Sequence, residues 1–293
     1  MIASELLRIR FSLAAKIVLV LVLAEAVFIG LLLAFLPSLI DGLVALNDVI
    51  PNATQADQFD ATQLVALSLG TSATQEVIID LLGNSGTGIG FPAIAALLLG
   101  ALTITTEHRR GSLIVSALAE PHRARLLLTK LSALAVTVLA ASILLIIVRG
   151  LMLTAGLAVQ SEPLLLDPAD VLGLWGRGTL TLILYAGLGF ALGLLSRSPV
   201  AAILVLGAAI IIESILRPIT LLIFGAPNPA QFLPFGLVPD ISGTNPLAAF
   251  TGTTVITSGL APAVALLVLT AWTLLVTAAA STRFVRTDLP DRQ

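Results

Sequence analysis

The sequence predicts an all-α protein that crosses a membrane six times and forms a single transmembrane domain over residues 1–293. Three observations predict this fold class. The chain is 57% hydrophobic and only 11% charged, whereas soluble domains carry about a quarter charged residues. Six apolar stretches approach or exceed the length of about 20 residues that a helix needs to cross a bilayer core. The lysines and arginines also gather on one side of these stretches.

The elements follow in order from the amino terminus. Residues 1–16 can form a short amphipathic helix that places Arg8, Arg10 and Lys16 against anionic headgroups. The alternative is a basic flank that only orients the first span, and the sequence supports both equally. The six predicted spans are 17–36, 88–106, 126–149, 174–195, 199–223 and 258–280.

Two longer segments are too polar to cross the membrane and are expected outside. Segment 37–85 contains acids but no lysine or arginine. Part of it, 73–82, has a helical pattern, with Ser72 and Gln75 at the spacing of a capping box. Segment 224–257 is rich in proline and glycine.

The distribution of basic residues predicts the orientation. Apart from Arg149, Arg177 and Arg217, every lysine and arginine falls on one side of the six spans. Because loops rich in these residues stay on the inner side, both termini are expected in the cytoplasm. The chain is then a multi-pass protein of the plasma or inner membrane, in contact with membrane lipid.

Four ionisable residues are expected within or near the hydrocarbon core, where a central charge costs about 2.5–3.5 kcal/mol on insertion scales. Glu213 and Arg217 are four residues apart. They either line a substrate route or, as the sequence favours, form a self-neutralising pair that helps the span insert. Arg149 is expected near the outer interface, where it can snorkel. Glu25, midway through its span, is protonated, paired with another helix, or exposed to a water-filled cavity.

The sequence contains no catalytic or metal-binding motif. It has no cysteine, and neither a nucleophile elbow nor an HExxH motif occurs. We therefore expect no enzyme activity, no metal or cofactor in this chain, and no nucleic-acid partner. The densest basic stretch, 107–125, is expected to form the main cytoplasmic loop.

This loop carries a family resemblance. Glu107, Arg110-Gly111-Ser112-Leu113, Leu118, Pro121, Arg123 and Lys130 resemble the E-x-x-x-G-[TS]-L pattern, with its following Pro, Arg and Lys, of ABC-2-type ABC transporter permease subunits. The stretches GLLSRSPVAAI (193–203), FLPFGLVPDI (232–241) and RFVRTDL (283–289) are similar to shorter parts of such permeases.

The resemblance implies a type V exporter-like permease whose loop 107–125 forms a coupling helix on a separate ATPase subunit. ATP and Mg would bind that partner. A second permease copy, identical or related, would complete a dimer that exports a lipophilic or amphiphilic substrate. The resemblance assigns the path-lining polar role to Glu25, Glu213 and Arg217, and ATPase coupling to Glu107, Arg109, Arg110, Gly111, Leu113, Pro121 and Arg123.

The residues are also compatible with two other functions. One is an ion-coupled secondary transporter that uses Glu25 and Glu213 as proton sites. The other is a non-catalytic membrane scaffold.

Overall fold

The computed structural model describes residues 2–49, 69–83, 88–111, 123–196, 198–225, 228–244 and 259–286. Within these residues the chain is helical and contains no strand. The elements are α1 (Ile2–Phe11), α2 (Leu13–Val49), α4 (Ser72–Ile79), α5 (Phe91–Arg110), α7 (Arg123–Gln160), α8 (Pro168–Ser196), α9 (Pro199–Phe224), η1 (Pro229–Phe232), η2 (Pro234–Gly236), α10 (Val238–Ser242) and α12 (Pro262–Arg286).

Six of these helices, α2, α5, α7, α8, α9 and α12, are long and apolar enough to cross a membrane. They correspond to the six predicted spans. Two helices extend well past the predicted limits. Helix α2 continues through Pro37 to Val49, and helix α7 continues beyond Arg149 to Gln160. A proline inside an apolar helix is tolerated where neighbouring groups satisfy the freed backbone.

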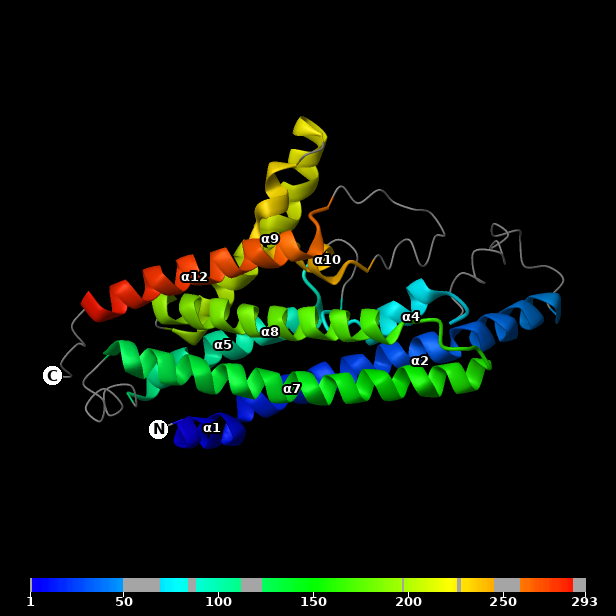
Figure 1. The fold of residues 1–293 in the computed structure, drawn as a ribbon, viewed down its shortest axis with the longest axis horizontal. Coiled ribbons are helices and arrows are strands. Elements are labelled where there is room, and N and C mark those ends of the chain that lie inside the picture. The colour runs from blue at the N-terminus through cyan, green and yellow to red at the C-terminus, as the bar shows by residue number, and fades with distance from the viewer. Residues whose placement is uncertain are drawn as a thin grey trace.

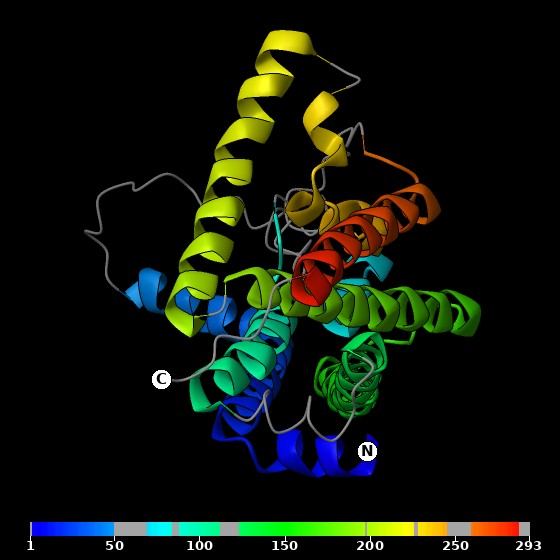
Figure 2. The same cartoon turned by 90° about the vertical axis from the view of Figure 1, so that its left-hand side faces the viewer.

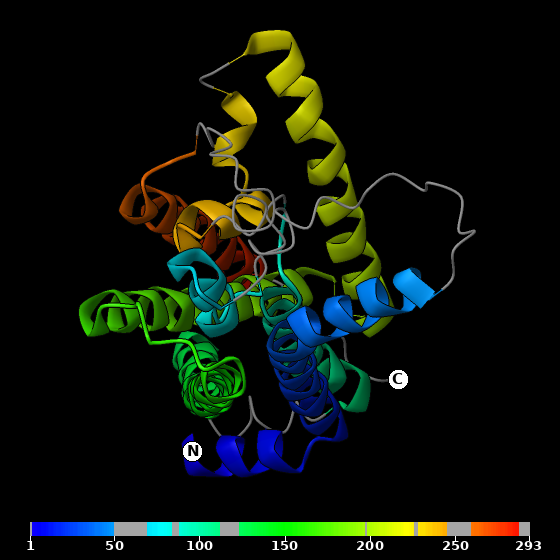
Figure 3. The ribbon, with the colours of Figure 1, turned by 90° about the vertical axis from the view of Figure 1, so that its right-hand side faces the viewer.

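Several of the long helices lie along a common axis. In Figure 1, α2, α7 and α8 lie along the long axis of the molecule. Helix α1 and the C-terminal end of α12 lie at one end of this bundle, and α4 lies toward the other. Views from the two ends show that α9 leaves the bundle at a steep angle to α7 (Figures 2 and 3). We call the end that carries α1 the α1 end.

The centre of the bundle is the contact between α5 and α8, where glycines bring the two backbones together. A Cβ atom at Gly100 would lie 1.9 Å from the carbonyl oxygen of Ala186. One at Gly189 would lie 2.0 Å from that of Leu97. Only glycine fits at such distances, so the GxxxG spacing of α8 serves close helix packing.

A second apolar cluster surrounds α4. Ile78 and Ile79 are each 1% exposed and pack with Leu33, Leu153 and Leu174 of the long helices. The sequence places this short helix in the segment expected outside the membrane, a side that stays a prediction. In the structure the helix packs against α2, α7 and α8. Its apolar residues occur in too short a run to signal burial.

The start of α4 also differs from the expected capping box. Thr71 is the N-cap, and its hydroxyl accepts a hydrogen bond from the amide of Thr74. The side chain of Gln75 instead joins separate segments: it donates to the carbonyls of Leu69 and Pro163 and accepts from the amide of Leu165. The predicted pairing of Ser72 with Gln75 is therefore wrong.

Candidate functional site

The first polar site is a network of four ionised side chains at the α1 end, which we call the α1 network. Lys130 Nζ lies 2.7 Å from Glu5 Oε1 and 2.7 Å from Glu107 Oε2. Arg8 pairs with the same two carboxylates. The side chains of Lys130 and Glu107 are only 1% and 4% exposed. Two acids and two bases thus neutralise one another, as buried charges require.

The α1 network joins three elements that are distant in sequence. Glu5 and Arg8 come from α1, Glu107 from the last turn of α5, and Lys130 from a position about two turns into α7. Helices α5 and α7 flank the basic connection 107–125. Both ends of this connection are therefore fastened to each other and to α1.

The other residues assigned to ATPase coupling come from α5, α7 and the connection between these two helices. Arg109 is exposed at the end of α5. Gly111 ends that helix with a φ of 70°, a left-handed conformation that glycine adopts without strain. Arg110 and Arg123 lie in the adjoining helices, whereas Leu113 and Pro121 lie outside the described residues.

The second polar site is an ion pair in the interior of the bundle. Arg149 Nη2 lies 2.9 Å from Glu25 Oε2, and Arg149 Nη1 donates to the carbonyl of Ile78. Of the three states open for Glu25, the structure therefore has the pairing with another helix. The expected snorkelling of Arg149 is wrong, because this residue is 1% exposed. Its charge is satisfied by α2 and α4 instead of by water.

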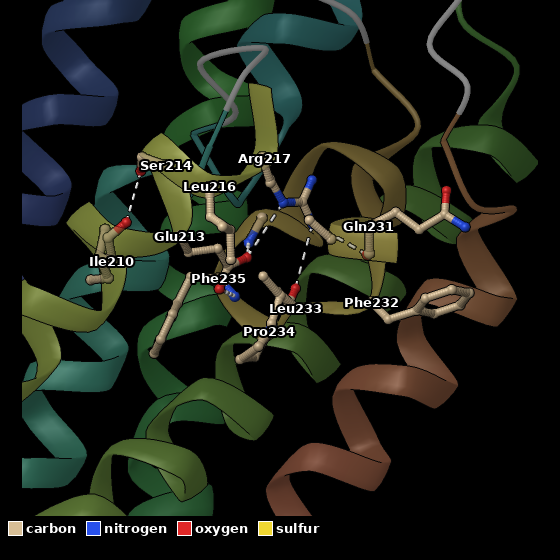
Figure 4. A network of polar contacts seen from close by, with 12 residues as sticks. Ile210, Glu213, Ser214, Leu216, Arg217, Gln231, Phe232, Leu233, Pro234 and Phe235 are labelled. Atoms are coloured by element: carbon tan, nitrogen blue, oxygen red, sulfur yellow. Dashed lines mark hydrogen bonds and ion pairs between the residues drawn. The ribbon is translucent and has the colours of Figure 1, made fainter. Parts of the chain in front are cut away.

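The third polar site lies beside α9 and is shown in Figure 4. The predicted pairing of Glu213 with Arg217 is present, with 3.4 Å between Nε and Oε1. Each side chain also reaches beyond the pair. The Glu213 carboxylate accepts from the amides of Phe235 and Gly236, and the Arg217 guanidinium donates to carbonyls of Gln231 and Leu233.

This third site holds the segment 229–242 against the bundle. The hydroxyl of Tyr185 donates to the carbonyl of Pro234 at 2.6 Å, and the indole of Trp272 donates to Phe232. Leu237 and Ile241 are fully buried. The predicted outer segment 224–257 thus includes, in its described part, short helices folded against α8, α9 and α12. Glu213 and Arg217 thus organise backbone as well as neutralising each other.

The sequence predicts these sites only in part. No role is assigned to Glu5, and Arg8 is expected against headgroups. The available signal is Lys130, a cation inside a long apolar helix, which must find an acidic partner. Its partner on α1 is 125 residues away, and no local spacing indicates so distant a contact.

Glu76 on α4 gives the structure a pH-dependent element. Burial raises the pKa of its carboxyl, the Asp170 carboxylate adds to this rise, and Arg177 opposes it. The unfolded chain ionises near the ordinary pKa of 4.5. The contribution of Glu76 to the free energy of unfolding is therefore greatest below that pH. This contribution is lost as the pH rises through the pKa of Glu76 in the folded state.

Glu76→Gln is accordingly expected to raise the midpoint of thermal unfolding at pH 7.5, and to lose this advantage below pH 4.5. The measurement is thermal unfolding in detergent at both pH values. Glu162→Gln controls for the removal of one negative charge near the same end of the bundle. An equal gain at both pH values would show that ionisation of Glu76 is not the cause.

No group of three His, Asp or Glu side chains among the described residues could hold a metal ion. The polar groups of all three sites instead pair with one another or with backbone. What this arrangement can do is fix helices and short segments relative to each other.

The fold and these sites define a class. Six helices are long and apolar enough to cross a membrane, and large aliphatic side chains such as Leu222, 88% exposed, cover their outer faces. Hydrocarbon solvates such a surface, and interior charges are paired as a low-dielectric medium requires. The chain is a multi-pass membrane protein. No protein-family model, curated protein or solved structure matches it.

Proposed function

We propose that this chain is the permease subunit of an ATP-driven ABC transporter of the ABC-2 type. A separate ATPase docks on the connection 107–125, and a second permease copy, identical or related, completes the translocation path. The assembly exports a lipophilic or amphiphilic substrate across the cell membrane. Both termini face the cytoplasm, because the basic connections stay on the inner side.

One observation carries this proposal: the α1 network fastens both ends of the basic connection to the membrane helices. A motor that tilts the connection would move α5 and α7 together through Glu107 and Lys130, and would move α1 with them. Packed helices transmit such a displacement as a rigid-body motion. A loop without this anchor would absorb the displacement locally.

The energy source supports the same proposal. The P-loop sequence GxxxxGK[ST] is absent from the chain, so ATP would have to bind a partner. Exposed cations such as Arg109 would meet that partner directly. Buried Glu107 would not contact the partner and would instead hold the end of α5 in place through Arg8 and Lys130.

In this proposal Glu25, Glu213 and Arg217 shape the translocation path instead of carrying protons through it. Each carboxylate already has an arginine partner, at 2.9 Å for Glu25 and 3.4 Å for Glu213. A proton-coupled transporter would need a carboxylate that alternates between a charged and a neutral form. These contacts weigh against the secondary-transporter alternative.

The first test is purification of the tagged chain from native membranes in mild detergent. A Walker-motif ATPase is expected to co-purify. Arg109→Glu should reduce its recovery several-fold, because the substitution reverses an exposed charge on the docking surface. Arg283→Glu, at an exposed cation in the last turns of α12, is the matched control and should retain the ATPase. Absence of any ATPase from the wild-type preparation would contradict the proposal.

A further inference from the structure

A cavity of about 450 Å³ lies between α1, α2, α5 and α7. Alanines open its walls, with Ala95 and Ala96 on α5 and Ala140 and Ala141 on α7. Its lining is otherwise mostly aliphatic. The volume falls within the range of about 300–1,000 Å³ that small-molecule sites occupy. The cavity therefore has the size and surface to hold a hydrocarbon chain.

Two cations line the same cavity. Arg10 follows α1's buried Ile9, and Lys16 lies near the start of α2. Among the described residues, neither has a carboxylate within ion-pairing distance, in contrast to Arg8 and Lys130 of the α1 network. Lys16 Nζ instead lies 5.7 Å from the ring centroid of Phe11. Positive charge at this site is thus available to an anion.

One buried hydroxyl adds a further polar group. Ser142 of α7 lines the cavity and is 1% exposed. Its Oγ has no hydrogen-bond partner in the described part of the chain. Other hydroxyls of this helix, such as those of Thr129 and Thr137, donate to the carbonyl four residues earlier. Ser142 therefore places a buried hydroxyl without a partner, among the described residues, in the wall of the cavity.

We propose that this cavity binds an anionic phospholipid, with an acyl chain in the aliphatic cavity and the phosphate on Arg10 and Lys16. Hydrocarbon from the bilayer fills an apolar cavity that would otherwise be empty. Two cations without acidic partners select an anionic headgroup over a zwitterionic one. The bound lipid is a resident component that fixes α1 against α2 and α7. This inference is independent of any transported substrate.

The test is native mass spectrometry of the purified full-length chain, titrated with phosphatidylglycerol or with phosphatidylcholine of the same acyl chains. The wild type is expected to bind phosphatidylglycerol about tenfold to thirtyfold more tightly, the effect of two cations near one phosphate. The double variant Arg10→Gln/Lys16→Gln should bind both lipids equally. Ala141→Phe should weaken both, because the ring occupies the space of the chain.

Arg283→Gln, which removes a cation outside the cavity lining, is the matched control and should keep the wild-type preference. Glycerol 3-phosphate has the headgroup charge but no chain, and it should not compete with the lipid. Equal binding of the two lipids by the wild type would overturn the proposal. So would a preference that survives in Arg10→Gln/Lys16→Gln, or competition by glycerol 3-phosphate. None of these readouts requires the ATPase or transport.

Discussion

Arg149→Leu is expected to lower the free energy of unfolding by about 3–5 kcal/mol, the typical cost of removing one partner from a buried ion pair. The substitution leaves the Glu25 carboxylate without its only ion-pair partner among the described residues. It also removes the donor to the carbonyl of Ile78. The measurement is reversible unfolding in mixed micelles, followed by circular dichroism.

The double variant Glu25→Gln/Arg149→Leu separates the ion pair from simple loss of packing. A neutral amide replaces the stranded charge, so the double variant should recover more than half of the stability lost by Arg149→Leu. Arg149→Leu within about 1 kcal/mol of the wild type would contradict the role of this pair, since that range is ordinary for point substitutions.

Lys130→Met is expected to have a loss of similar size, about 3–5 kcal/mol, because it leaves two carboxylates with one cation. Lys130 contacts both Glu5 and Glu107 at 2.7 Å, and Arg8 alone cannot neutralise them. The repulsion should also loosen α1. Unfolding in lipid-free detergent gives the stability, and limited proteolysis near Ser4 reports the detachment of α1.

Arg109→Met provides the control. It removes an exposed cation at the end of α5 that lies outside the α1 network and outside the cavity lining, and it should alter stability by no more than about 0.5 kcal/mol. If Lys130→Met were equally mild, the α1 network would not hold α1 to the bundle. The proposed transmission from the basic connection would then lose its physical basis.

The long apolar helices could be predicted from the sequence because each carries its own signal. A run of about 20 aliphatic residues needs no partner to be recognised. Their ends were harder to place. Helix α2 continues past Pro37 to Val49, although a proline followed by polar residues usually marks an end.

The candidate sites could be predicted only in part. The spacing of Glu213 and Arg217 predicts their contact because both lie on one helix face. Their bonds to Phe235 and Leu233 depend on how a later segment folds back, which no local pattern encodes. The same limit applies to Arg149: its distance along α7 indicates its depth, but its partner Glu25 is 124 residues away.

The residues assigned to ATPase coupling are likewise predictable from the sequence only in part. Gly111 is recognisable in the sequence, and the structure gives it a helix-ending conformation with positive φ. Glu107 is recognisable too, yet its burial beside Lys130 is a property of three helices together. Its assigned contact with an ATPase stays a prediction, and the structure adds an anchoring role that the motif alone does not indicate.

The glycine contact between α5 and α8 has a mechanical consequence. Because backbone touches backbone at Gly100 and Gly189, a shift of either helix along its axis would drive a side chain into a carbonyl group. The two helices are therefore locked in register and form a fixed post. Helix α9 has few buried residues and no such backbone contact at its glycine, Gly207. Its register depends instead on the side chains of Glu213 and Arg217, which bond to the backbone of segment 229–242.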